Sequence, residues 1–208
     1  MAYTDNDRME IRKRIAQACH EQIRRGGLAS VKARTLAASL EQATGWIYRF
    51  YPDFDAVILA ANSLTLSMLD ERLSATAEES RGSSVADRFF ALALTYMDFS
   101  QEEYSLWAAL FEHQMPRGRA ISNEHKQEHY ILFRHIEEPL SEILPHLSPD
   151  ELRMTARTIY SAVHGVVSIG LQPRLDPVPL PAMKVQLRML TNAFARGYEI
   201  QTSVAATT

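Results

Sequence analysis

The sequence contains one cysteine, Cys19, among 208 residues. No internal disulfide can therefore form, and a reducing compartment is the expected setting. Long apolar runs are also missing, because the longest candidate, at 160–171, is interrupted by His164 and is shorter than the roughly 20 residues that cross a bilayer. The N-terminal stretch is charged and has no apolar core, so it does not read as a secretion signal. These absences predict a soluble, cytoplasmic protein with no membrane partner.

Catalytic motifs are scarce as well. The sequence has no Gly-rich phosphate loop, no Gly-x-Ser-x-Gly elbow and no Cys/His pair in a catalytic context. The string HKQEH at 125–129 fits a zinc pattern in which two histidines share a helix face. It has no evident third ligand, and chance matches are common with seven histidines, so we interpret it as a solvated polar face. We expect no enzyme, no metal and no cofactor.

Charge is spread unevenly along the chain. The net charge is −3 overall, but residues 1–52 carry nine Lys and Arg against five acids, which is net +4, and the remainder is net −7. A basic segment beside an acidic body is typical of a protein whose one end meets nucleic-acid phosphates. Chance clustering is the alternative, because an excess of four charges is modest.

Strand signals are nearly absent, and apolar residues recur at the three- and four-residue spacing of helices. Two glycines at 26–27 mark one helix end, Pro139 ends or kinks another helix, and the run SPDE at 148–151 caps a third. The pattern predicts helices at about 8–25, 31–39, 43–50, 53–77, 84–99, 102–113, 122–138, 148–170 and 182–198.

The expected fold is therefore all-α. A three-helix head with a helix-turn-helix for DNA binding occupies 1–52, and a bundle of about six helices for ligand binding and dimerisation occupies 53–200. Residues 201–208 are expected to be a disordered tail. Within the head, the stretch 36–53 reads as a short helix, a tight turn and a second short helix, which is the build of a DNA-reading motif.

The runs RTLAASL at 34–40, GWIYRFYPD at 45–53 and DAVI at 55–58 resemble the TetR/AcrR (tetracycline-repressor) family of bacterial transcription regulators. Ile47, Tyr48 and Tyr51 match the Ile-Tyr and aromatic positions of that pattern. A weaker resemblance, YSAVHG at 160–165, is to the His-Gly helix in the ligand domain of one branch of the family. The resemblance implies a homodimeric regulator that binds double-stranded DNA.

Two positions depart from the family pattern. Glu41 stands where the family has its turn glycine, and Phe54 stands where it has a lysine expected to touch phosphate. A positive φ at position 41 would cost a non-glycine residue on the order of 1 kcal/mol. The carboxylate would also repel a nearby phosphate. Both changes weaken the electrostatic case for DNA contact.

The candidate DNA contacts are polar or aromatic residues of the head: Lys32, Arg34, Gln42, Thr44, Trp46, Tyr48 and Arg49. Arg49 can bind guanine or phosphate bidentately. Trp46 offers its ring to a thymine methyl, and the family resemblance implies that the Tyr48 hydroxyl contacts a phosphate. Core packing in a small head is the alternative for these two aromatic residues.

The remaining helices are rich in aromatic residues, methionine and histidine, which suits an apolar ligand cavity with a few polar anchors. The candidate ligand contacts are Met97, Trp107, Phe111, Phe133 and His164. Core packing is the alternative for each of them, and for His164 a structural role is the preferred interpretation.

Apolar faces on the last two predicted helices suggest a seam between two copies of the chain. The candidate seam residues are Ile159, Val163, Val167, Leu187, Leu190 and Phe194. We therefore expect a ligand-responsive DNA-binding transcriptional regulator, a repressor that an unknown small-molecule effector releases from its operator. The alternative is an all-α ligand carrier or metal-dependent enzyme with a vestigial DNA-binding head.

Overall fold

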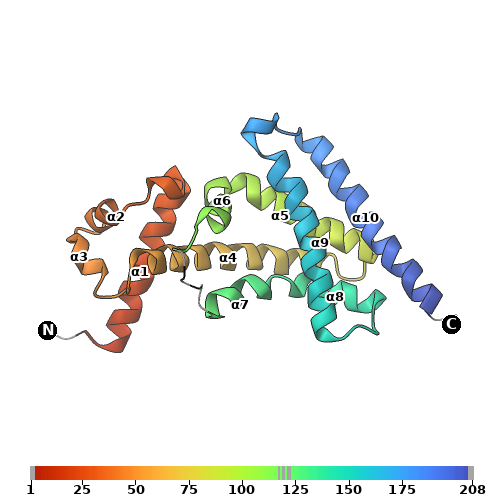
Figure 1. Ribbon diagram of the computed structural model, residues 1–208, viewed down its shortest axis with the longest axis horizontal. Helices are drawn as coiled ribbons and strands as arrows, with labels where there is room; N and C mark the ends of the chain where they lie inside the picture. The colour runs from red at the N-terminus through yellow and green to blue at the C-terminus, as the bar shows by residue number, and fades with distance from the viewer. Residues whose placement is uncertain (1–2, 117, 119, 121–122, 206–208) are drawn as a thin grey trace. The chain divides into compact units, whose positions relative to one another are not determined.

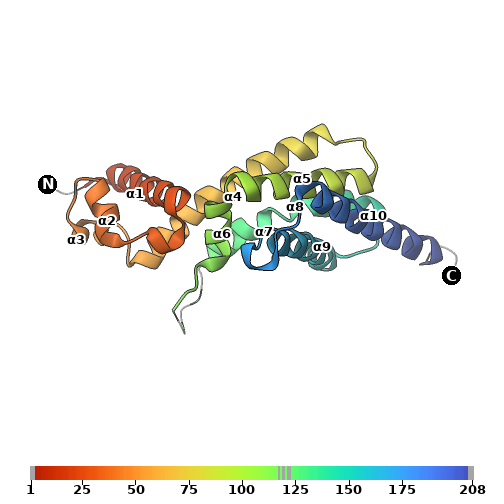
Figure 2. The same ribbon diagram turned by 90° about the horizontal axis from the view of Figure 1, so that it is seen from above.

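The computed structural model describes residues 3–116, 118, 120 and 123–205. This part of the chain holds ten α-helices and two short 3-10 helices, with no strand among the described residues (Figures 1 and 2). The all-α prediction is confirmed. The chain divides into two compact units, one formed by residues up to Met68 with Glu102–Glu128, and one formed by Leu69–Gln101 with residues from His129 onward.

The first unit begins with three helices and a 3-10 turn: α1 (Asp5–Gly26), η1 (Leu28–Ser30), α2 (Ala33–Ser39) and α3 (Thr44–Ile47). Thr4 caps α1, because its hydroxyl accepts the Asp7 N–H while the Asp7 carboxylate accepts the Thr4 N–H. Gly27 ends α1 at a φ of 71°, where glycine is favoured. The glycine stop that the sequence predicts is confirmed.

An apolar core holds this head together. Ile15, Cys19 and Ile23 from α1 pack with Leu36 of α2 and Ile47 of α3. The same core includes residues beyond the predicted boundary at residue 52, from the start of α4 (Phe54–Glu79) and from α6 (Tyr104–Glu112). The head is therefore stabilised by more of the chain than its own three helices.

The second unit contains most of the longer helices: the end of α4, α5 (Val85–Glu102), α8 (Arg134–Ile143), α9 (Pro149–Gly170) and α10 (Leu180–Ala205), with η2 (Pro173–Leu175) between the last two. Ser148 caps α9 through the predicted capping box with Glu151. The buried Arg88 of α5 pairs with Glu138 and Glu142 of α8, which ties these two helices together.

The predicted helix at 122–138 is wrong, because the chain forms two helices there, α7 (Asn123–Ile131) and α8. The break falls at Leu132 and Phe133, which are both buried and lie in turns tightened by i→i−3 hydrogen bonds. Pro139, the predicted end or kink, lies inside α8. Burial of the two apolar residues, and not the proline, sets where the chain turns.

The last helix also differs from its prediction. α10 extends through Ala205, whereas the sequence pattern places its end near Tyr198 and a disordered tail from residue 201. Residues 206–208 of that predicted tail lie outside the described residues. No helix in the described part of the chain is both long and apolar enough to cross a membrane.

Candidate DNA-binding head and ligand cavity

The turn between α2 and α3 positions the recognition helix. The Leu40 and Gln42 N–H groups both donate to the Ala37 carbonyl, and the Glu41 N–H donates to the Ala38 carbonyl. Glu41 lies at a φ of 58°, so the positive φ expected where the family has glycine is present. The exposed glutamate therefore occupies strained backbone, at a cost of about 1 kcal/mol.

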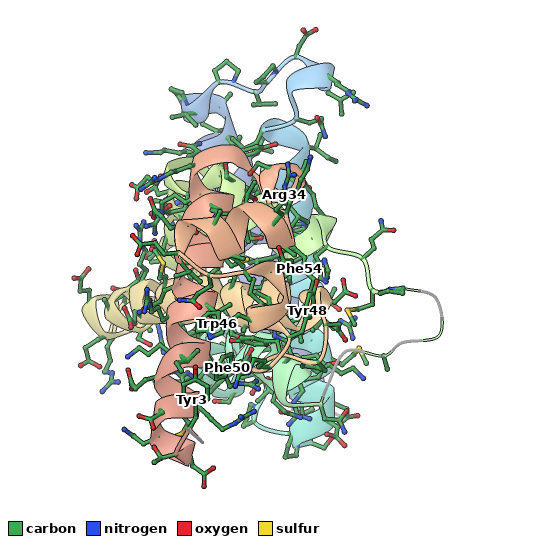
Figure 3. The ribbon with its side chains drawn as sticks, turned by 90° about the vertical axis from the view of Figure 1, so that its left-hand side faces the viewer. Tyr3, Arg34, Trp46, Tyr48, Phe50 and Phe54 are labelled. Carbon is green, nitrogen blue, oxygen red and sulfur yellow. The ribbon has the colours of Figure 1, made fainter. Side chains whose placement is uncertain are left out.

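The recognition helix presents part of its predicted set outward. Arg49 and Gln42 are exposed, Thr44 is half-buried, and the Tyr48 side chain is 46% exposed. The ring of Trp46 instead meets Phe50 edge-on, with centroids 5.0 Å apart, and packs against the head core. Figure 3 shows Trp46, Phe50 and Tyr3 as one group and Tyr48 apart from it. Trp46 thus contributes to packing, and Tyr48 is available to a partner.

Side chains from α1 hold the end of the recognition segment, which comprises α3 and the residues that follow it through Phe50. The Arg8 guanidinium donates to the Arg49 carbonyl at 2.9 Å, and the Arg12 guanidinium donates to the Phe50 carbonyl at 2.8 Å. The Tyr51 hydroxyl donates back to the Arg12 carbonyl at 2.9 Å. Because α3 has only four helical residues, it has too few internal hydrogen bonds to hold its own geometry. These contacts supply what the short helix lacks.

This support is not visible in the sequence pattern. There, Arg8 and Arg12 contribute only to the basic charge of residues 1–52. The Arg49 guanidinium carbon lies 5.3 Å from the centre of the Tyr3 ring, so Arg49 is oriented by a cation–π contact while it stays exposed.

The remaining predicted cations, Lys32 and Arg34, and Phe54, which replaces the family's lysine, also have clear positions. Lys32 and Arg34 are exposed at the start of α2. Phe54 is half-buried and packs against the head core, so the residue that replaces the family's lysine contributes to packing instead of charge.

The second unit contains a cavity of about 40 Å³. Its walls come from α4, α5, α8 and α9 and from the turn before α8: Leu69, Leu73, Phe89, Leu92, Ala93, Tyr96, Leu132, His135, Ile136, Ile159, Tyr160 and Val163. These side chains are mostly apolar. The sequence predicted a cavity of this character, but from other residues.

The five predicted ligand contacts are not among the residues that line this cavity. Trp107 and Phe111 belong to α6 in the first unit, and Met97 is fully buried in α5. Phe133 and His164 are one layer away, because each ring contacts Tyr160, at centroid distances of 5.4 and 5.8 Å. Periodicity places residues on a helix, but it does not say which of several buried faces meets a void.

A chain of hydrogen bonds runs behind the cavity wall. The Tyr96 hydroxyl lies 2.7 Å from His164 Nδ1 and 3.4 Å from the Tyr160 hydroxyl. Burial lowers the pKa of His164, which keeps its ring neutral, and burial raises the pKa of Tyr160. The preferred structural role of His164 is therefore compatible with its position, where it orients a tyrosine that lines the cavity.

A second polar group lies at another part of the same wall. The Nε2 atom of His135 is 2.8 Å from an Asp70 carboxylate oxygen, and Arg134 donates to both oxygens of that carboxylate at 3.0 and 2.7 Å. One carboxylate thus serves two basic side chains, and its charge is balanced locally.

The predicted seam needs a correction. Ile159, Val163, Val167 and Leu187 are already buried within the single chain, so they cannot be the residues that face a second copy. Leu190 and Phe194 are half-buried. α9 and α10 pack against each other, and the large apolar residues that they leave exposed among the described side chains are Met154, Ile169, Leu180, Val185 and Met189.

The HKQEH string is also placed differently from its interpretation as a solvated face. His125 is buried, and its Nδ1 lies 3.2 Å from the Ser63 hydroxyl and 2.9 Å from the Glu128 carboxylate. Nowhere in the described ranges do three or more His, Cys, Asp or Glu side chains form a group suited to a metal ion.

A small helix-turn-helix head joined by a long helix to a second helical unit with an apolar cavity is the architecture of a one-component DNA-binding regulator. The comparisons give the family. A profile described as "Tetracyclin repressor-like, C-terminal domain" matches residues 89–193, and the chain belongs to this family. No curated protein matches the sequence.

Several solved structures share the fold. A protein of unknown function from Rhodococcus sp. RHA1 is 18% identical with a TM-score of 0.69, and the match covers 90% of this chain and 94% of that chain. A TetR-family transcriptional regulator from Streptomyces coelicolor is 16% identical with a TM-score of 0.65, covering 98% and 87%. A transcriptional regulator from Rhodococcus sp. Rha1 is 19% identical with a TM-score of 0.64, covering 90% and 97%.

Proposed function

We propose that this protein is a homodimeric DNA-binding repressor that a small molecule releases from its operator. The observation that carries the proposal is the recognition segment, in which Tyr48 and Arg49 are exposed at the end of a helix-turn-helix whose apolar side is buried. This arrangement suits entry of α3 into a major groove, with base edges and phosphates within reach of the exposed side chains.

The cations of the head supply the phosphate contacts in this proposal. Lys32 and Arg34 are exposed at the start of α2, and Arg49 is exposed after α3. Arg49 is the candidate for a guanine or phosphate contact, and Gln42 and Thr44 are candidates for hydrogen bonds to bases. Trp46 is retained only as an apolar contact at the edge of the interface, because its ring packs on Phe50.

Dimerisation would involve the outward faces of α9 and α10. Met154 and Ile169 are exposed on α9, and Val185 and Met189 are exposed on α10, while the inward faces of the two helices are buried together. Exposed apolar groups on neighbouring helices favour association with a second copy. Two heads would then read half-sites about 34–36 Å apart.

Release by a ligand requires a difference in affinity between two states. Moving the population from mostly DNA-bound to mostly released takes about 5.5 kcal/mol of differential binding. α4 is the proposed lever, because Leu69 and Leu73 near its end line the cavity and Phe54 at its start packs against the head core. A ligand that displaces the two leucines acts on the same helix that supports the head.

Anisotropy titrations with the DNA upstream of the protein's own gene test the DNA-binding part. Arg49→Ala is expected to weaken binding about tenfold or more, and Tyr48→Phe by several-fold, without loss of folded protein. Arg81→Ala is the matched control, because Arg81 is also exposed but lies in the second unit and pairs locally with Glu78. Binding that is indifferent to both head variants would contradict the proposal.

A further inference from the structure

The cavity wall contains one basic side chain, His135, which is already paired with Asp70. The twelve lining residues include no Asp, Glu, Lys or Arg, and nine of them are aliphatic or phenylalanine side chains. The three polar members are Tyr96, Tyr160 and His135. An ionised ligand would lose its hydration here and find no free counter-charge on the lining, which is strongly unfavourable.

The charged groups nearest to the wall are already satisfied. Asp70 accepts hydrogen bonds from Arg134 and lies 2.8 Å from His135, so the carboxylate is shared between two basic side chains. Recruiting Arg134 to a ligand anion would leave Asp70 with one partner fewer, and the cost of breaking that pair would oppose the gain.

The tyrosines on the polar side of the cavity belong to a chain of uncharged side chains joined by hydrogen bonds. Tyr96 hydrogen-bonds to His164 Nδ1, and the Tyr160 hydroxyl lies 3.4 Å from the Tyr96 hydroxyl. His164 is kept neutral because burial lowers its pKa. When Tyr96 donates to His164, its oxygen can still accept a hydrogen bond, and the Tyr160 hydroxyl can turn toward a ligand.

We infer that the effector of this protein is a small uncharged molecule with an aliphatic body and one hydroxyl or carbonyl oxygen, which hydrogen-bonds to the Tyr96–Tyr160 pair. The inference rests on the proposed function in taking this cavity as the effector site. The aliphatic lining recognises the body of the ligand, and the tyrosine hydroxyls recognise its oxygen. Carboxylates and phosphates of similar size are excluded because the lining offers them no free counter-charge, His135 being paired with Asp70.

The size of the cavity adds a mechanical consequence. At about 40 Å³ it holds only a few atoms, so a ring-sized ligand must displace lining side chains. Leu69 and Leu73 on α4 are among the lining residues, as are Leu92 and Ala93 on α5. A ligand that displaces the two leucines therefore acts on α4, the proposed lever helix.

Titration calorimetry on the full chain without DNA tests the inference with two ring-matched probes, cyclohexanol and cyclohexanecarboxylate. Cyclohexanol is expected to bind saturably and the carboxylate at least tenfold more weakly. Tyr96→Phe is expected to weaken cyclohexanol binding about fivefold, which corresponds to one lost neutral hydrogen bond. Equal binding of both probes, or saturable binding of neither, would overturn the inference.

Two alanine-to-leucine variants test whether cyclohexanol binds in this cavity. Ala93→Leu fills the lining of α5 and is expected to abolish cyclohexanol binding, whereas Ala75→Leu makes the same change at an exposed position of α4 and should leave it intact. Ala93→Val replaces Ala93→Leu if the larger side chain prevents folding. If cyclohexanol still binds when the cavity is filled, the ligand binds elsewhere and the inference is overturned.

The inference and the proposed function fail separately. Specific operator binding without saturable cyclohexanol binding would overturn only the ligand class. Cyclohexanol binding that depends on Ala93, in a protein that binds no upstream DNA, would overturn only the proposed repressor.

Discussion

The recognition helix α3 and the long helix α9 are held in opposite ways. α9 spans 22 residues and begins with its own capping box, in which Ser148 and Glu151 satisfy each other's backbone N–H groups. α3 spans four residues, has no side-chain cap within the described residues, and depends on two arginines from α1. A long helix carries most of its own geometry, whereas a short one takes it from its neighbours. The residues that determine DNA binding therefore include some that never touch DNA.

The largest expected effect concerns the two cores. Phe50→Ala should cost about 3–5 kcal/mol in the head, because Phe50 is buried and anchors the rings of Trp46 and Tyr3. Phe89→Ala is the matched change in the second unit, where Phe89 is equally buried. Hydrogen exchange read by mass spectrometry should show lost protection in the mutated unit first. Equal loss in both units for either variant would mean that they unfold as one, and the comparison would fail.

The next effect distinguishes a residue that positions the recognition segment from one that contacts DNA. Arg12→Gln removes the hydrogen bond to the Phe50 carbonyl and the cation–π contact with Tyr51, and is expected to weaken DNA binding about tenfold. The slope of log affinity against log salt should stay unchanged, because Arg12 acts through the backbone of the recognition segment. Arg12→Lys should restore little, since an ammonium cannot reproduce the planar fork.

Lys13→Gln is the control for that measurement. Lys13 is a neighbouring exposed cation on α1 with no corresponding contact to the recognition segment among the described interactions. A shallower salt slope for Arg12→Gln, by about one unit, would instead make Arg12 a phosphate contact.

A third effect concerns the free energy of unfolding at acidic pH. Burial lowers the pKa of His20, and the positive charge of Arg24 lowers it further. The unfolded chain therefore takes up the proton more readily, so the free energy of unfolding should fall as pH drops below about 6.5, the ordinary histidine pKa, toward the lowered value. His20→Leu should flatten this decline in urea unfolding curves. Unchanged pH dependence in His20→Leu would rule out this histidine as a source.

The smallest effect concerns Glu41. Glu41→Asn and Glu41→Gln both remove the charge, and both should raise DNA affinity by a few-fold, because one repulsion from phosphate is lost. Asparagine also tolerates the φ of 58°, so Glu41→Asn should be more stable than Glu41→Gln by up to about 1 kcal/mol. Equal stability of the two variants would show that the turn is not strained.

The sequence predicted the head more fully than the body for a physical reason. Contacts in the head are local, and a glycine stop, a short apolar stripe and an outward arginine are all visible within about 50 residues. The positive φ at Glu41 was expected from the resemblance, because the family has glycine at this position, and the structure has it. The arginine support from α1 was missed because its partners are backbone carbonyls about 40 positions away, and carbonyls leave no trace in a sequence.

In the second unit, the spacing of apolar residues located the buried helices but did not show which face of each helix meets which neighbour. Met97 and Ile159 are both buried apolar residues at helical spacing, yet only Ile159 lines the cavity. Four of the six predicted interface residues are buried within the chain for the same reason, because a helix such as α9 has one apolar face against its own chain and other apolar residues that are exposed. Periodicity reports that a side chain is apolar, and it does not distinguish these faces.

The amino-acid order alone determined the helical class, the capped helix starts, the strained turn and the polar residues of the recognition segment, because each depends on neighbours within a few positions. Only the tertiary structure decided which apolar residues enclose the cavity, which remain for a second copy, and which arginines hold the recognition segment. Those assignments depend on the packing of helices that are far apart in the chain, and one-dimensional spacing carries no information about that packing.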